Sequence, residues 1–562
     1  MRIEFPRRLG TALLRVHGLS LCAALGIYAG VSGPAAHGQT FSGSVIETAI
    51  SSANPGDTIQ LQSGTYLLDN TLAFSKSNLT LQGQADGSTI IQFAGGFDQT
   101  GNDTPLIDLS GQAGVTLRNL KLDGEDRTNG ASYGVYAFGG GGGHVLEHLN
   151  ITNLANPGQF APIGIYLEGG VSQTAIRQNT ITDVGLNSDF GSGIRVHGDS
   201  DYNIIEYNTI DGTGRGGIFA LGNSDSNLGA STLDGLVIRH NTVVNSAQGL
   251  TPGQAVGDLG IELQNDIADA VIEDNVIDRR VSLDNVQRVA VRRNTVSQSS
   301  NTTTTTASYG LELVDAQDVV FDNNQVLGDI HFGVSISGDG DTRYTLFEGN
   351  NIQDATTFGV QVQGNDTGGP GSAERLLFAN NMITGTSGVG ALFPNTGDGF
   401  RFNEAFDEIT LDGNTLTGND GFEIALVNPP SGSTITLSDN TIEGDSREDP
   451  TSAVYQILDP PLTRQTLEFE TGDTITVVFD DLSGTVVHVL WDLGTGAPLV
   501  TSDENFSENT DSLTPGTEFL VVGWDDLGAA DTVRVLIIPE PTIALSLGVI
   551  GALCFRPRPS RR

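Results

Sequence analysis

The chain has 562 residues, of which 68 are acidic and 27 are basic, so its formal net charge is −41. A field of this sign repels nucleic acid and anionic membrane surfaces, which excludes nucleic acid as a partner. It also repels polyanionic glycans unless Ca²⁺ bridges the two charges.

The first segment, residues 1–38, has the pattern of a secretory signal peptide. Four arginines precede an apolar run from Leu19 to Val31, and small residues follow it. The run of about 13 residues is shorter than the roughly 20 that span a bilayer, so a membrane anchor is the weaker interpretation. We therefore expect export and removal of this segment.

Residues 39–56 predict a short capping helix. Val45, Ile46, Ala49 and Ile50 recur at helical spacing. A helix laid over the open end of a sheet would cover an edge that otherwise pairs with other chains.

Ten asparagines mark a repeat that runs through most of the chain. Each lies three residues after one apolar residue and two before another, as in Ile176–Ile181. They are Asn179, Asn208, Asn241, Asn275, Asn294, Asn324, Asn350, Asn381, Asn414 and Asn440. Their spacings of 19 to 34 residues are typical of a solenoid. We expect the asparagines to stack at turns and to form a structural ladder.

A second recurring strand starts with glycine and a hydrophobic residue, as in residues 134–138, 164–168 and 193–197. The strands are short and separated by turn residues, and equivalent strands of neighbouring units would pair in parallel. The repeat resembles the right-handed parallel β-helix family typified by pectate lyase-like proteins. This resemblance implies an all-β fold with a right-handed parallel β-helix over residues 57–445.

Residues 446–464 predict a linker, because the repeat frame stops after Ile442. Six strand-like runs within residues 465–538 then predict a small β-sandwich. This part resembles the bacterial pre-peptidase C-terminal type of domain, and a spacer or a carbohydrate-binding module is the expected role.

The last segment, residues 539–562, mirrors the first. Pro539, Glu540 and Pro541 precede an apolar run, and four arginines lie near the end of the chain. The combination resembles the PEP-CTERM sorting signal. That resemblance implies cleavage by an exosortase of a Gram-negative bacterium, with only transient contact with the membrane.

Removal of both ends takes away eight arginines and two glutamates, which leaves 19 basic and 66 acidic residues and a net charge of −47. Cys22 and Cys554 lie in the removed ends, so the mature protein uses neither disulfides nor thiol chemistry. Its stability must therefore come from the stacking of its repeat units.

Equivalent residues of stacked strands form outward rows with a spacing of about 4.8 Å. The third position of the glycine-led strand gives the row Tyr136, Tyr166, Arg195, Phe219, Glu262, Ser282, Glu312 and Ser335. The fifth position gives the row Phe138, Glu168, His197, Leu221, Gln264 and Asp284.

The candidate catalytic groups are Glu168, Arg195, His197 and Glu262 in these rows and Arg215 in the turn just before Phe219. Two carboxylates a few ångströms apart would serve glycoside hydrolysis. A lyase instead needs His or Arg to remove the proton beside a uronate carboxylate, with a cation to neutralise that carboxylate. Candidate substrate-binding residues are Tyr136, Tyr166, Phe219, Arg279 and Arg280. The alternative is a solvated row of charge pairs without a ligand.

Three further features have two interpretations each. The shortest unit gathers arginines that would either grip a carboxylated sugar or pair with Asp278, Asp284 and Glu262: Arg279, Arg280, Arg288, Arg292 and Arg293. Five glycines at 139–143 would allow movement over a ligand or form a plain turn. Ca²⁺ is a candidate cofactor at Asp199 and Asp201 or at Asp339 and Asp341, although neither pair has EF-hand spacing.

The sequence thus predicts an exported protein, extracellular or on the outer surface of a Gram-negative cell, that binds extracellular polysaccharide. In one interpretation it also cleaves the polysaccharide as a lyase or a glycoside hydrolase. The alternative is a non-catalytic surface or matrix protein that binds exopolysaccharide. The cluster of Glu, His, Arg and aromatic residues favours the enzyme, whereas the acidic field and the lack of a family catalytic motif favour the matrix protein.

Overall fold

A computed structural model describes residues 39–99, 103–157, 161–222, 232–249, 259–298, 308–337, 341–363, 372–388, 397–403, 406–427 and 433–443, and a set of strands between 447 and 538. The predicted signal peptide (1–38) and sorting tail (539–562) lie outside these residues. Among the helices of the described ranges, none is long and apolar enough to cross a membrane.

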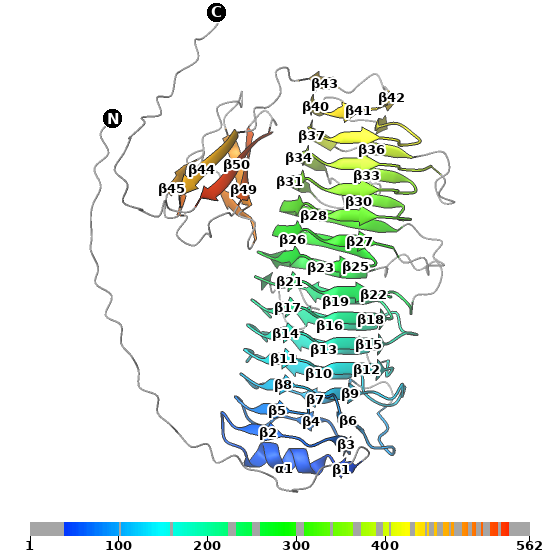
Figure 1. Ribbon diagram of the computed structural model, residues 1–562, viewed down its shortest axis with the longest axis vertical. Coiled ribbons are helices and arrows are strands. Elements are labelled where there is room, and N and C mark those ends of the chain that lie inside the picture. The colour runs from blue at the N-terminus through cyan, green and yellow to red at the C-terminus, as the bar shows by residue number, and fades with distance from the viewer. Residues whose placement is uncertain are drawn as a thin grey trace, which may run out of the picture.

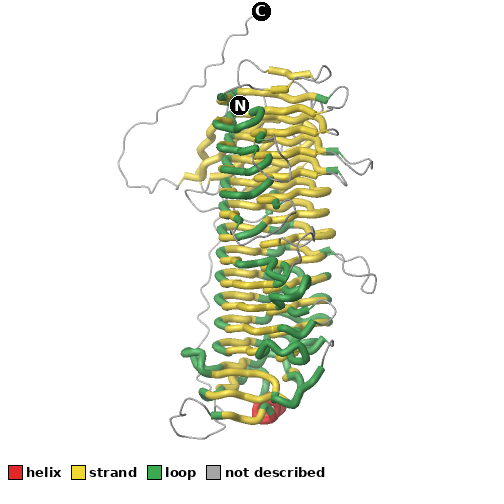
Figure 2. Tube along the Cα trace, turned by 90° about the vertical axis from the view of Figure 1, so that its right-hand side faces the viewer, coloured by secondary structure: helices red, strands yellow, loops and turns green. Residues whose placement is uncertain are grey.

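The main body is a right-handed parallel β-helix, as predicted. Its coils build three faces, which we number in chain order within a coil (Figure 1, Figure 2). The first and second faces belong to one 28-stranded sheet, because the long strands β23 (Leu259–Ala268), β26 (Arg280–Arg292) and β28 (Tyr309–Asp322) continue from one face into the other. The third face is a 15-stranded sheet.

The strands of each face follow one another along the stack. The first face holds β4 (Leu72–Ala73), β7 (Pro105–Asp108), β10 (Tyr133–Phe138), β13 (Ile163–Glu168), β16 (Ser192–His197), β19 (Gly216–Leu221), β23, β26, β28, β30 (Phe332–Ser337), β33 (Phe358–Gln363), β36 (Asp398–Asn403), β39 (Ile424–Val427) and β42 (Arg447–Glu448).

The second face holds β2 (Thr58–Gln60), β5 (Thr80–Gln82), β8 (Thr116–Arg118), β11 (Val145–Glu147), β14 (Ala175–Arg177), β17 (Ile204–Glu206), β21 (Val237–Arg239), β24 (Val271–Glu273), the ends of β26 and β28, β31 (Thr342–Glu348), β34 (Ala373–Ala379), β37 (Phe406–Asp412), β40 (Thr434–Ser438) and β43 (Val454–Ile457), with β20 (Leu233–Asp234) at the corner before it. The third face holds β1 (Thr40–Ser42), β3 (Gly64–Leu68), β6 (Thr89–Phe93), β9 (Lys121–Asp123), β12 (Asn150–Leu154), β15 (Thr180–Val184), β18 (Thr209–Thr213), β22 (Thr242–Val244), β25 (Val276–Ile277), β27 (Thr295–Ser297), β29 (Gln325–Leu327), β32 (Asn351–Gln353), β35 (Met382–Thr384), β38 (Thr415–Thr417) and β41 (Thr441–Ile442).

Alternation of side chains explains why these residues form coils. In β17 the central Ile205 is fully buried, while Ile204 and Glu206 on either side are only half-buried. Repetition of this pattern gives one continuous apolar core from Ile46 to Ile435. A single coil could not bury its apolar face alone, so the stack folds as a unit.

A helix covers the N-terminal end of the stack, as expected for the segment 39–56. It is α1 (Ser44–Ser52), and Ile46 and Ile50 pack into the core. Val45, which the sequence placed on the apolar face, is instead 46% exposed. Only Ile46 and Ile50, four residues apart, face the first coil.

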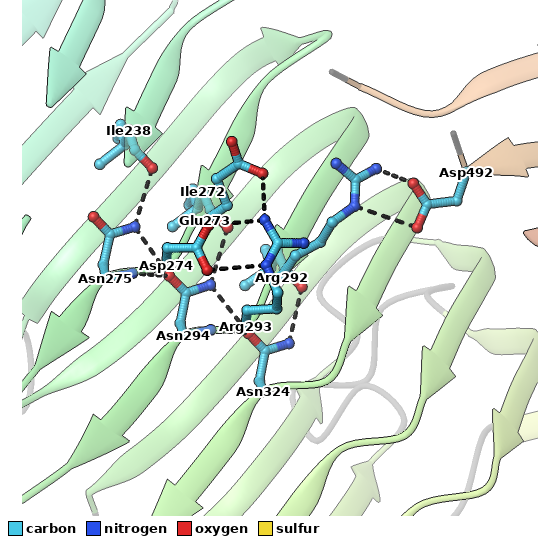
Figure 3. Close-up of polar contacts among 11 residues, drawn as sticks. Ile238, Ile272, Glu273, Asp274, Asn275, Arg292, Arg293, Asn294, Asn324 and Asp492 are labelled. Atoms are coloured by element: carbon cyan, nitrogen blue, oxygen red, sulfur yellow. Dashed lines mark hydrogen bonds and ion pairs between the residues drawn. The ribbon is translucent and has the colours of Figure 1, made fainter. Parts of the chain in front are cut away.

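The asparagine ladder is confirmed. Each ladder asparagine accepts hydrogen bonds through Oδ1 from the coil before it. Those before Asn440 donate through Nδ2 to the next asparagine and to a carbonyl of the preceding coil, as Asn275 and Asn294 show in Figure 3. The residue before each asparagine turns the chain in the left-handed conformation, with φ of +55° at Gln178 and +56° at Tyr207. This costs a non-glycine residue roughly 1 kcal/mol, which the ladder's hydrogen bonds offset.

The stack continues beyond the predicted boundary at residue 445. Within the predicted linker, β42 pairs with β39 and β43 pairs with β40, both in parallel. The sequence prediction ended the β-helix too early because these last strands lack the asparagine frame.

The C-terminal part contains a five-stranded sheet in the order β44 (Gln465–Glu470), β50 (Ala530–Ile538), β49 (Glu518–Asp525), β46 (Val486–Asp492) and β47 (Leu499–Thr501). Two further strands, β45 (Thr474–Thr476) and β48 (Ser507–Asn509), form a separate antiparallel pair. The six predicted strand runs coincide with β44 to β47, β49 and β50. That the two sheets pack as a sandwich stays a prediction.

The C-terminal sheet lies against the second face of the β-helix, beside β26, β28, β31 and β34 (Figure 1). Trp524 is buried there and meets Tyr344 edge to face, with ring centroids 5.7 Å apart. Arg292 of β26 forms a buried ion pair with Asp492 of β46 (Figure 3). The sequence did not indicate this contact, which joins residues 200 positions apart.

Candidate functional site

Both predicted outward rows lie in register on the first face. In the row of third positions, Tyr136 pairs with Tyr166 and Tyr166 with Arg195. Phe219, Glu262, Ser282, Glu312 and Ser335 then follow on successive coils. In the row of fifth positions, Glu168 pairs with His197. Residues distant in sequence thus stand about one strand spacing apart.

Two tyrosines, Tyr136 and Tyr166, lie beside Glu168 at the N-terminal end of these rows. The Tyr136 hydroxyl donates to Oε2 of Glu168 at 3.0 Å. The negative charge of Glu168 also acts on the Tyr166 hydroxyl. Burial and the nearby carboxylate raise the pKa of both tyrosines above 10, so both remain protonated donors at neutral pH.

His197 extends this chain of hydrogen bonds. Its Nδ1 lies 3.0 Å from the Tyr166 hydroxyl oxygen. In the tautomer with its proton on Nδ1, the ring donates to the tyrosine oxygen. Nε2 then carries a free electron pair, and within the described residues this buried atom has no hydrogen-bond partner. Burial, reinforced by Arg195, holds the pKa of His197 well below 6.5, so the ring is neutral.

Two arginines lie beside His197 on one aromatic ring. The guanidinium carbon of Arg195 is 4.5 Å from the Phe219 ring centroid, and that of Arg215 is 5.5 Å away. Burial lowers the pKa of Arg195 to about 10, which leaves it charged at neutral pH. The ring of Phe219 therefore packs against cations, and its predicted role in stacking a sugar stays a prediction.

Farther along the same row, the carboxylates lie near arginines from outside it. Arg215 Nη2 lies 3.9 Å from Oε2 of Glu262, and Arg280 Nη1 lies 2.8 Å from Oε2 of Glu312. Burial raises the pKa of Glu262 to about 7, although Arg215 and Arg280 oppose the shift. Glu262 is therefore poised between its neutral and charged forms at neutral pH.

Most of the candidate groups are covered rather than open to solvent. Arg195 is 5% exposed, His197 6% and Glu262 7%. Tyr136 and Glu168 are half-buried, and Phe138 on the same strand as Tyr136 is 38% exposed. The accessible end of the cluster is therefore the N-terminal one, where the aromatic rings and Glu168 lie.

The two candidate carboxylates are far apart. Glu168 is on β13 and Glu262 on β23, three strand pairings farther along the first face. At about 4.8 Å per pairing their backbones are separated by roughly 14 Å. Glycosidase carboxylates are only about 5 to 9.5 Å apart, so this pair does not match a hydrolase.

The five arginines of the shortest unit point to different places. Arg288 pairs with Asp269, Arg293 with Asp274 and Glu273, and Arg292 with Asp492. Arg279 is 3% exposed and donates to the carbonyls of Asp278 and Ser246. They do not gather at one notch, because successive residues of the strand and its turns face opposite sides of the coil.

The glycine run 139–143 and the aspartates proposed to bind Ca²⁺ can be compared with the structure. A Cβ on Gly141 or Gly142 would lie 2.0 Å from a backbone oxygen of the neighbouring coil, so the glycines allow coils to approach. Asp201 uses Oδ1 to accept the Asp234 amide. Among the described residues no group of three or more His, Cys, Asp or Glu is arranged to hold a metal ion. Asp339 lies outside the described residues.

Sequence reasoning missed Tyr133, which precedes Gly134 on β10. Its ring stacks on Tyr136 at 5.4 Å and meets Tyr166 edge to face at 5.5 Å. Tyr133, Tyr166 and Ile163 form a small apolar cluster with Ala161, apart from the main core. Alternation along β10 could not have indicated Tyr133, because it lies three residues before Tyr136 and alternation places it on the side of Val135 and Ala137.

Comparisons with known proteins support the fold. A family model described as a right-handed beta helix region matches residues 105–255. No curated protein sequence matches this chain.

Solved structures give low similarities. The catalytic unit of a thermostable GH87 alpha-1,3-glucanase from Streptomyces thermodiastaticus strain HF3-3 is 15% identical, with a TM-score of 0.44 over 75% of this chain and 68% of that one. The A-module of the mannuronan C-5 epimerase AlgE4 from Azotobacter vinelandii is 16% identical, with a TM-score of 0.37 over 73% and 94%. A double mutant of the periplasmic alginate epimerase AlgG is 11% identical, with a TM-score of 0.40 over 69% and 84%. Similarities this low carry no argument about the chemistry of this chain.

Proposed function

We propose that this protein is exported and acts as a lyase on an extracellular acidic polysaccharide, with His197 as the general base. The observation that carries the proposal is the hydrogen bond between His197 Nδ1 and the Tyr166 hydroxyl, which leaves the electron pair of a buried Nε2 without a partner. A neutral imidazole that donates through Nδ1 to a tyrosine oxygen is arranged to remove a proton through Nε2.

The neighbouring charges suit proton removal beside a carboxylate. In a uronate, the proton on the carbon next to the carboxylate would pass to Nε2 of His197, and its electron pair would form the new double bond as the glycosidic oxygen departs. The carboxylate must be neutralised for that proton to be acidic, and Arg195 on the same strand is a fixed cation beside His197. Hydrolysis is the weaker alternative, because Glu168 and Glu262 are too far apart.

Substrate would approach from the accessible end of the cluster. Phe138 is partly exposed, and Tyr136 and Glu168 lie beside it. A sugar ring stacked on Phe138 would lie two strand spacings, roughly 10 Å, from His197, with Glu168 on the strand between them. In this proposal Tyr136 contacts the substrate, whereas Tyr166, which is only 4% exposed, orients His197.

The test is turnover on a panel of uronate-containing and neutral polysaccharides, with and without Ca²⁺. Unsaturated product is read by absorbance, and reducing ends are counted separately. His197→Ala and Glu168→Gln should each lower turnover by about 100-fold or more. Gln264→Ala, two coils away in the same row, is the matched control and should retain activity. Reducing ends without unsaturated product would refute the lyase chemistry.

A non-catalytic matrix protein is the second candidate, and the low exposure of the rows favours it. In that case the parent protein shows no turnover on any polymer but is retained by an acidic polysaccharide. Phe138→Ala and Tyr136→Ala should then weaken retention, because these rings lie at the accessible end.

Export and processing complete the proposal. The segment 1–38 would direct secretion, and an exosortase would cleave near Pro539–Pro541. The protein would then reside outside the cell or on the outer surface of a Gram-negative bacterium.

A further inference from the structure

We propose that two copies of this chain associate in antiparallel orientation through the N-terminal half of the second face. This inference is independent of the proposed lyase activity and uses a different side of the β-helix. It rests on two adjacent outward columns of side chains on the second-face strands β8, β11, β14, β17, β21 and β24. We call them the charge column and the apolar column.

The charge column alternates in sign over six successive coils. Its members are the third residues of the second-face strands: Arg118, Glu147, Arg177, Glu206, Arg239 and Glu273. Within the chain Arg177 pairs with Glu147 at 2.7 Å and Arg239 with Glu206 at 2.7 Å. The arginine side chains nevertheless remain about 40% exposed, at 41% for Arg177 and 39% for Arg239. Each can therefore contact a second carboxylate.

The apolar column runs beside it on the same strands. Its members are Thr116, Val145, Ala175, Ile204, Val237 and Val271. Val145, Ala175, Ile204 and Val237 are only half-buried, although they form a continuous stripe. Tyr202 and Tyr207, at the two ends of β17, are 60% and 53% exposed. Exposed tyrosines beside an apolar stripe are characteristic of protein interfaces.

The same column is already an interface farther along the stack. Above Val271 it continues as Ala290, Val320, Leu346 and Leu377. Val320, Leu346 and Leu377 pack with Trp524, Leu490 and Val522 of the C-terminal sheet and are almost fully buried. Figure 1 shows the sheet beside this upper part, while β11, β14, β17 and β21 lie below it. The proposed surface is thus continuous with an interface that the protein itself forms.

The charge pattern identifies the partner as a second copy. A two-fold axis that runs along the strands, midway between β14 and β17, reverses the order of the coils. Arg177 then faces Glu206, Glu147 faces Arg239, and Arg118 faces Glu273 of the other copy. The apolar column matches as well, because Ala175 faces Ile204 and Val145 faces Val237. An axis along the stack would instead lay the apolar column of one copy on the charge column of the other.

Sedimentation velocity of the secreted protein tests the association. From about 1 to about 100 µM the parent should shift from monomer to dimer, the range expected for a specific contact of moderate affinity. Ile204→Arg should abolish the shift, because it places a charge at the centre of the contact. Met382→Arg is the matched control on the third face, where the side chain is similarly exposed, and should leave the dimer intact.

Charge reversal gives a sharper test. Arg177→Glu and Glu206→Arg should each weaken self-association by about 100-fold or more, because like charges then meet twice. An equimolar mixture of the two variants should form a heterodimer, since position 177 of each variant then faces an opposite charge at position 206 of the other. Circular dichroism of each variant checks the fold. A monomeric parent throughout the range, a dimer that survives Ile204→Arg, or a mixture that stays monomeric would each overturn the proposal. So would a monomeric parent in which Ile204→Arg abolishes binding to a polysaccharide, because the surface would then bind glycan.

Discussion

Replacement of Asn241 by leucine probes how the ladder stabilises the β-helix. Asn241 is 1% exposed and lies in the middle of the ladder. Its Oδ1 accepts from the backbone amide and from Nδ2 of Asn208, each at 3.0 Å. Its Nδ2 donates to the Ile205 carbonyl at 2.8 Å and to Oδ1 of Asn275 at 3.0 Å.

The magnitude follows from which groups lose their partner. Asn241→Leu leaves three buried groups unsatisfied, namely the Asn208 amide, one Nδ2 proton of Asn208 and the Ile205 carbonyl. Oδ1 of Asn275 still accepts from the backbone amide of residue 241 at 2.9 Å. At about 1 to 3 kcal/mol for each group, the free energy of unfolding should fall by roughly 3 kcal/mol or more.

Asn179 provides the matched control, because it begins the ladder. Asn179→Leu leaves only two groups unsatisfied, the Leu149 amide and the Leu146 carbonyl. The new leucine would also stack on Leu149, which occupies the same position one coil earlier. We therefore expect Asn179→Leu to cost about 1 kcal/mol less than Asn241→Leu.

The assay is urea unfolding followed by far-ultraviolet circular dichroism. Tryptophan fluorescence is less suitable, since Trp491 and Trp524 both lie in the C-terminal sheet and also respond to loss of its contact with the β-helix. Equal midpoints for the parent and both variants, or a larger loss at Asn179 than at Asn241, would refute this explanation of the ladder.

Two further predictions concern the contact between the C-terminal sheet and the β-helix. Arg292→Met should release the sheet and shift Trp524 fluorescence to the red, and it should lower the free energy of unfolding by about 3 kcal/mol or more, because Asp492 and Asp322 lose the charge of Arg292. Asp492→Leu should lower it less, since Arg292 keeps Asp322 on the next coil. Equal losses, or a larger loss for Asp492→Leu, would contradict this. The pKa of Asp322 is raised to about 7, chiefly by burial. Because this folded pKa exceeds the ordinary 3.8, the stability that the group contributes is fully present below about pH 4 and is lost as the pH rises toward 7. Asp322→Asn should flatten that dependence in urea titrations at pH 4.5 and 7.5, and an unchanged slope would rule out this assignment.

The β-helix could be predicted from the sequence because its periodicity is local. An apolar residue, the asparagine and the next apolar residue recur within six positions, so Ile176, Asn179 and Ile181 reveal the turn on their own. The same regularity gave the register of the outward rows, including the juxtaposition of Glu168 and His197. Where the frame was missing, as in β42 and β43, the prediction stopped too early.

The parts of the site that depend on long-range packing could not be predicted. Period and spacing place a residue on a face but do not say what covers it, so His197 and Arg195 were expected in an open row and are almost buried. The hydrogen bond between Tyr166 and His197 depends on rotamers, which the sequence does not encode locally. The pairing of Arg292 with Asp492 depends on how two separate sheets dock.

The two covered surfaces of this protein bear on whether the first-face rows have a function. Under the C-terminal sheet, the covered outward column consists largely of apolar residues such as Val320, Leu346 and Leu377, which is the inexpensive way to bury a sheet surface. On the first face, residues covered to a similar extent are Arg195, His197 and Glu262. Burial of ionisable groups costs free energy that apolar residues at the same positions would avoid. The second face buries an ionisable pair too, but there Arg292 meets Asp492 directly. The buried Nε2 of His197, in contrast, has no hydrogen-bond partner among the described residues, so we propose that the first-face cluster binds a ligand or moves a proton.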